Sequence, residues 1–170
     1  MKFSRRSMSL VLGAGMLSAL GCNGGGGKPK TASLTPGDMP DGADWTGKYF
    51  DPIYGYFHLI QEKNKVSGKW ERPQKDKWGD IHGDVTGNVF RFNWTEYTRG
   101  AVANATRSGK GYFVYKRPAG ENVDDVIEGE LGWGQDEVGN PLRGVKQRNE
   151  RADPDSIGGT QPTDFVGGDW

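Results

Sequence analysis

Residues 65–97 read KVSGKWERPQKDKWGDIHGDVTGNVFRFNWTEY. Two segments within them, Val66–Trp70 and Ile81–Val85, share the order apolar, polar, glycine, polar, apolar, and Ile127–Leu131 repeats it. Because side chains of a strand alternate between two faces, the apolar residues and the glycine of each segment lie on one face. A glycine in the middle of a strand allows tight coiling and leaves room for a neighbouring aromatic ring. The pattern therefore predicts strands of a strongly curved sheet with an apolar inner face.

Short alternating segments with turn residues between them continue on both sides of this region, and no segment shows a helical period of three to four residues. Tight links such as Lys63-Asn64 and Gly87-Asn88 predict hairpins between successive strands. The expected strands are Trp45–Asp51, Tyr54–Glu62, Lys65–Arg72, Trp78–Thr86, Asn88–Tyr97, Gly109–Arg117, Val126–Trp133 and Leu142–Arg148. We therefore predict an all-β fold, a single antiparallel up-and-down meander of about eight strands that closes, or nearly closes, into a barrel.

Four aromatic residues of the predicted strands are expected to occupy the slots beside the glycines on the inner face. They are candidates either for the packed core or for contact with a ligand inside the barrel. These residues are Trp70, Trp94, Phe113 and Trp133.

The first 22 residues have the features of a signal peptide. Lys2, Arg5 and Arg6 precede an apolar run, residues 8–20, that is too short to span a bilayer as a helix. Ala19, Leu20 and Gly21 lead directly into Cys22, the single cysteine of the chain, and this segment resembles the lipobox of bacterial lipoproteins. The resemblance implies a diacylglycerol on Cys22 and a protein anchored to a bacterial membrane in the cell envelope. The alternative to lipidation is the ordinary signal peptide of a secreted protein. Residues 4–8, with Arg5-Arg6, also resemble the start of a twin-arginine export signal, and the alternative at this point is a simple basic segment.

Composition divides the rest of the chain. Residues 23–43 are rich in Gly, Lys, Pro and Asp and are predicted to form a flexible tether. Residues 44–149 contain the predicted strands and form the barrel domain, and the polar residues 150–170 are predicted to be a disordered tail.

The domain also resembles the small meander barrels of the lipocalin and avidin superfamily. Two segments, Thr46-Gly47-Lys48-Tyr49 and Val66–Trp70, are similar to the first strands of avidin-type barrels. The residues that bind biotin in avidins are not matched, for example at Asp51 and Gly55. In lipocalins an arginine of the last strand lies across an aromatic residue of the first strand. The resemblance thus implies that Tyr49, with Arg143 or Arg148, closes one end of the barrel.

Charge and motifs point away from several functions. Lys plus Arg (22) equals Asp plus Glu (22), so no overall charge attracts nucleic acid, and none is expected as a partner. Glu128 and Glu130 share a strand face but are expected to point to solvent. His58 and His82 fall on separate strands and suit no metal site, and nucleotide and hydrolase signatures are absent, so no cofactor and no catalytic residue are predicted.

Three functions follow from these expectations. The first is a non-enzymatic cell-envelope lipoprotein whose barrel binds a small apolar ligand or an envelope protein. The second is a structural or assembly lipoprotein with a filled barrel that acts through surface contacts. A remote third is an enzyme of the barrel class. The interior distinguishes them, because an apolar cavity favours the first, continuous packing the second, and a buried carboxylate or histidine inside a cavity the third.

Overall fold

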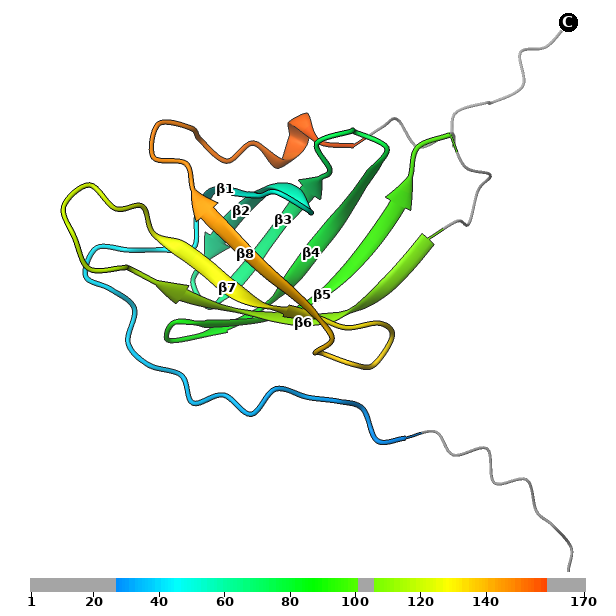
Figure 1. Ribbon diagram of the computed structural model, residues 1–170, viewed down its shortest axis with the longest axis horizontal. Coiled ribbons are helices and arrows are strands. Elements are labelled where there is room, and N and C mark those ends of the chain that lie inside the picture. The colour runs from blue at the N-terminus through cyan, green and yellow to red at the C-terminus, as the bar shows by residue number, and fades with distance from the viewer. Residues whose placement is uncertain (1–26, 101–105, 159–170) are drawn as a thin grey trace, which may run out of the picture.

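The computed structural model describes residues 27–100 and 106–158, which form a closed antiparallel barrel of eight strands in up-and-down order (Figure 1). The predicted fold class is confirmed. The strands are β1 (Gly47–Asp51), β2 (Gly55–Glu62), β3 (Lys65–Glu71), β4 (Lys77–Thr86), β5 (Val89–Thr98), β6 (Thr106–Lys116), β7 (Val126–Leu131) and β8 (Asn140–Lys146).

Each strand pairs with the next along the chain, and β1 pairs with β8 through Tyr49 opposite Lys146 and Phe50 opposite Val145. Closure leaves no open edge within the sheet. The observed strands match the predicted ones in number and order and differ from them at the ends. For example, β6 begins at Thr106 rather than Gly109, and β7 ends at Leu131 rather than Trp133.

The inner face carries the apolar residues and glycines that the repeated pattern predicted. Gly68 lies opposite Leu59 of β2, and Gly129 lies opposite Phe113 of β6. At Gly68 an added Cβ would lie 3.0 Å from the Leu59 Cα, and at Gly129 it would lie 3.1 Å from the Phe113 Cα. The neighbouring backbone occupies the space of a side chain, so these strands coil closely enough to require glycine.

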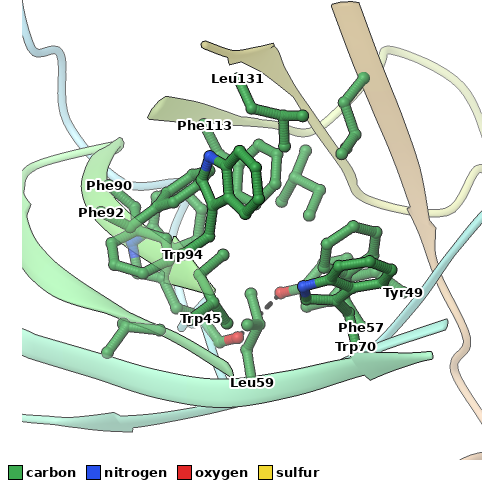
Figure 2. Packing of buried hydrophobic residues seen from close by; sticks show 14 of the residues in the cluster. Trp45, Tyr49, Phe57, Leu59, Trp70, Phe90, Phe92, Trp94, Phe113 and Leu131 are labelled. Carbon is green, nitrogen blue, oxygen red and sulfur yellow. Dashed lines mark hydrogen bonds between the residues drawn. The ribbon is translucent and has the colours of Figure 1, made fainter. Parts of the chain in front are cut away.

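Aromatic side chains fill much of the interior (Figure 2). Phe113 is fully buried, and its ring centroid lies 4.7 Å from that of Phe92 and 5.9 Å from that of Phe57. Trp45, which precedes β1, packs edge-on against Tyr115 at 5.4 Å. The core is therefore a continuous cluster of rings rather than an empty barrel.

The chain before β1 lies along the outside of the barrel, where the sequence predicted a flexible tether. We call residues 30–44 the N-terminal strap (blue to cyan in Figure 1). The Lys30 N–H donates to Asp136 Oδ1 at 2.9 Å, and the Gly37 N–H donates to Asn88 Oδ1 at 2.7 Å. Backbone hydrogen bonds to loop side chains thus hold a polar segment that has little apolar surface to bury.

The chain after β8 also packs against the barrel, over the outer face of β1, β2 and β3. We call residues 147–158 the C-terminal strap; it contains a short 3-10 helix, Pro154–Ser156. The Gln147 N–H donates to the Lys48 carbonyl oxygen at 2.8 Å, and Ile157 is buried. The expectation of a disordered tail therefore fails for residues 150–158, because Ile157 supplies an apolar anchor. Residues 159–170 lie outside the described part of the chain.

Candidate functional site

The two ends of the barrel differ, and the end where β1 begins is closed by packed side chains. Trp45 and Tyr49 are fully buried there, and the Tyr49 hydroxyl donates to the Trp45 carbonyl oxygen at 3.0 Å. Lys146 Nζ lies 5.6 Å from the centroid of the Tyr49 ring and 5.4 Å from that of Tyr115. Burial lowers the pKa of Lys146 and raises the pKa of Tyr49. Packed side chains therefore close this end of the barrel, and we interpret their role as structural.

Resemblance to lipocalins implied that Tyr49 and either Arg143 or Arg148 close the barrel. Tyr49 lies at the closed end, but the cation over its ring is Lys146. Alternation along β8 places residues 142, 144 and 146 on the inner face, so Arg143 points outward, where its Nε lies 3.2 Å from Glu128 Oε1. Arg148 lies beyond the end of β8. The arginine assignment is corrected to Lys146 for this geometric reason.

The opposite end, where β1 ends, holds a pocket of about 40 Å³ that we call the mouth pocket. Its walls come from inward residues of β2, β3, β4, β5 and β7 and from the loops after β1 and β7. The lining is aromatic and aliphatic except for one carboxylate. The aromatic lining residues are Tyr54, Phe57, Trp70, Phe92, Trp94 and Trp133; the others are Ile81, Leu131 and Glu96.

Two tryptophans form adjoining walls of the mouth pocket. The rings of Trp94 and Trp133 have centroids 5.1 Å apart and planes inclined at 74°. The Trp94 indole N–H donates to the carbonyl oxygens of Lys110 and Gly132, each at 3.2 Å, which fixes its ring. Trp133 remains 49% exposed, so the pocket opens to solvent on its side. The Arg107 guanidinium lies 5.6 Å from the centroid of the Trp133 ring.

Glycines on the facing strands make room for the pocket's indole rings. Trp70 of β3 lies opposite Gly79 of β4, and Trp94 of β5 lies opposite Gly109 of β6. An added Cβ at Gly79 would lie 2.5 Å from Trp70 Nε1, and one at Gly109 would lie 2.8 Å from Trp94 Cζ2. The rings therefore lie flat over backbone that carries no side chain, which is the slot that the sequence pattern predicted.

One buried carboxylate lies among these rings. Glu96 is 9% exposed and forms an ion pair with Lys77, with 2.7 Å between Lys77 Nζ and Glu96 Oε1. Register places Gly79 directly between Trp70 and Glu96 on adjacent strands. The carboxylate thus lies next to an indole across a glycine, and the pocket combines an aromatic wall with one acidic group.

A second buried carboxylate supports the rim. Asp51 Oδ1 accepts hydrogen bonds from the N–H groups of Ile53 and Tyr54 at 2.7 and 2.8 Å. Its Oδ2 accepts from the Arg143 N–H at 2.9 Å. Asp51 therefore fixes the loop that brings Tyr54 over the pocket. Burial raises the pKa of Tyr54.

The sequence named four inner aromatics, and the structure brings three of them together. Trp70, Trp94 and Trp133 line the mouth pocket, whereas Phe113 lies deeper in the core and is fully buried. Sequence reasoning missed Glu96. The signal was available, because Glu96 is two residues from Trp94 on the same predicted strand and hence on the same face.

Groups considered for acid–base or metal chemistry lie elsewhere. Glu128 and Glu130 are on the outer face of the barrel. Hydrogen bonds from Lys116 and Arg143 lower the pKa of Glu128, and the bond from Lys116 contributes most. His82 is exposed on β4, and His58 lies under the C-terminal strap. Within residues 27–100 and 106–158, no three His, Cys, Asp or Glu side chains gather as a metal site would require.

Cys22, the predicted lipid attachment site, lies outside the described residues. Among the residues that the structure describes, no helix has the length and apolar character needed to cross a bilayer. No family model, curated protein or solved structure matches this chain.

Proposed function

We propose that the chain is a non-enzymatic lipoprotein of a bacterial cell envelope, anchored through Cys22, whose barrel binds a small apolar ligand in the mouth pocket. The observation that carries the binding role is the contrast between the two ends of the barrel. Side chains seal one end, whereas the other presents three tryptophan rings around an open space. Concave aromatic surfaces with few polar groups are typical of small-molecule sites.

The size of the pocket limits the ligand. A volume of about 40 Å³ is far below the several hundred Å³ that enclose a drug-sized molecule. It accommodates roughly three water-sized groups. The ligand, or the part of it that enters, is therefore a compact group of a few heavy atoms, while the remainder lies at the rim beside Trp133.

Indole N–H resonances provide a direct test. Titration of the ¹⁵N-labelled full-length chain with 3,3-dimethylbutan-1-ol, a small neutral probe, should shift the signals of Trp70, Trp94 and Trp133. Those of Trp45 at the closed end and Trp78 on the outer face should stay in place. The Trp133→Ala variant should weaken binding by about threefold to tenfold because one wall is lost. If all five signals remain unchanged up to saturating probe, the mouth pocket is not a binding site.

A second function also has an observation in its favour. The aromatic cluster fills much of the interior, and Ile53 and Trp133 expose 63% and 49% of their surfaces at the open end. Such a rim could contact another envelope protein without accepting a ligand. This alternative predicts that Ile53→Ser weakens capture of a partner and that the small probe causes no change at Trp70.

A further inference from the structure

We propose that the mouth pocket selects a small alkylammonium group, held against the Trp94 and Trp133 rings and the Glu96 carboxylate. This inference rests on the proposed function, because it names the chemistry of the group that enters the same pocket.

The indole rings of the pocket can interact with a cation. Trp94 and Trp133 meet edge to face, inclined at 74° with centroids 5.1 Å apart. The Arg107 guanidinium already lies 5.6 Å from the centroid of the Trp133 ring, so the ligand's ammonium group would compete with Arg107 for the negative face of tryptophan, the strongest of the aromatic acceptors. Tyr54 and Trp70 line the same pocket and add further aromatic surface.

The carboxylate makes the pocket selective for positive charge over a neutral ligand. Glu96 lines the pocket, whereas its partner Lys77 does not. The Lys77 ion pair engages Oε1 at 2.7 Å. We assign Oε2 as the oxygen that faces the ligand's ammonium group. An anionic ligand would meet this carboxylate at close range and is disfavoured.

The space fits a compact head group. Room for roughly three water-sized groups accommodates the methyl groups of a trimethylammonium or the end of a primary alkylammonium. Because Trp133 is 49% exposed, the rest of the ligand can extend into solvent past this ring. Both a free amine and the head group of a zwitterionic phospholipid have this chemistry.

Choline and 3,3-dimethylbutan-1-ol test the inference, because they share one shape and differ only by a positively charged nitrogen in place of a carbon. Both probes are titrated into the full-length chain carrying Cys22→Ser, with the indole signals of Trp70, Trp94 and Trp133 as the readout. Choline should bind about five- to tenfold more tightly than the alcohol. Glu96→Gln should reduce this preference to about twofold, and an unchanged dispersion of the backbone amide signals shows that the variant is folded. Glu128→Gln, which removes an outward carboxylate, should change neither Kd.

The source of the group is resolved by cosedimentation with vesicles. If phosphatidylcholine vesicles bind the Cys22→Ser chain more strongly than phosphatidylglycerol vesicles, and Glu96→Gln removes the difference, the group belongs to a lipid head group. If free choline binds and the vesicles show no such difference, it belongs to a solute. Either result supports the inference. If the alcohol binds at the mouth and choline binds no better, the ammonium inference is wrong and the proposed function stands. If neither probe shifts the indole signals, the proposed function itself fails.

Discussion

Replacing Gly68 by alanine tests the close coiling on which the barrel depends. The new Cβ would overlap the His58 carbonyl oxygen and lie 3.0 Å from both the carbonyl carbon of His58 and the Cα of Leu59. Carbon atoms in contact are normally about 3.5 to 4.0 Å apart, so β2 and β3 must move apart locally by roughly 0.5 to 1 Å. All of these neighbours are backbone atoms, and no flexible side chain can yield in their place.

Opposing contributions set the size of the effect. Strained packing costs about 1 to 3 kcal/mol, and lengthened hydrogen bonds between β2 and β3 add about 1 kcal/mol. Alanine gains about 0.5 to 1 kcal/mol over glycine because the unfolded chain has less freedom. We therefore expect Gly68→Ala to lower the free energy of unfolding by about 2 kcal/mol.

Urea denaturation measures this difference, with the midpoint expected to fall by about 1 M. Two controls bracket the result. Gly27→Ala changes a glycine that has no atom near its Cβ position and should be neutral. Ser67→Val changes the exposed, outward neighbour of Gly68 and should be neutral or slightly stabilising, since valine has the higher strand propensity. A Gly68→Ala variant as stable as the parent would refute the close approach of β2 to β3.

Three further predictions concern the ends of the chain. If Cys22 carries a lipid, Cys22→Ser should shift the protein from the detergent phase to the aqueous phase on partitioning, and an unchanged distribution would exclude the anchor. Limited proteolysis should leave a core that begins near residue 30 and ends near residue 158, because hydrogen bonds hold both straps to the barrel. A resistant core of residues 44–149 would show instead that the straps detach. Burial lowers the pKa of His58, and the Asp153 carbonyl oxygen, 2.8 Å from Nδ1, opposes this shift. As the pH falls, His58 therefore takes up a proton more readily in the unfolded state than in the folded state. The stability that neutral His58 contributes is present above its ordinary pKa of about 6.5 and is lost as the pH falls through the lower folded value. His58→Gln should flatten the dependence of the unfolding free energy on pH in this range, and identical profiles for variant and parent would contradict the assignment.

The fold could be predicted because its signal is local. Alternation of apolar and polar residues specifies each strand, and tight turns make neighbours along the chain neighbours in the sheet. The glycines of the repeated pattern specify the inner face, as the positions of Gly68 and Gly129 confirm. An up-and-down barrel requires no long-range connection beyond the pairing of β1 with β8.

The straps and the site could not be derived in the same way. The N-terminal strap has a polar composition, and it is ordered by hydrogen bonds from single backbone groups to distant loop side chains, such as Gly37 to Asn88. Composition does not report such bonds. Arg143 or Arg148 was expected at the closed end from the resemblance alone. Alternation along β8 turns Arg143 outward, and the pairing of Tyr49 with Lys146 brings the lysine to this end. Glu96 was hidden by the expectation that carboxylates of a strand face solvent.

The path of the N-terminal strap connects the proposed anchor to the proposed site. Both backbone polar groups of Lys30 form hydrogen bonds to the loop between β7 and β8. The Lys30 N–H donates to Asp136, and the Lys30 carbonyl oxygen accepts from the Glu137 N–H at 2.8 Å. This loop contains Trp133, which lines the mouth pocket. Lys30 lies eight positions after Cys22 in the chain, and even when fully extended this stretch spans no more than about 28 Å. A lipid on Cys22 would therefore hold Lys30, and the β7–β8 loop to which it is bonded, within that distance of the membrane anchor.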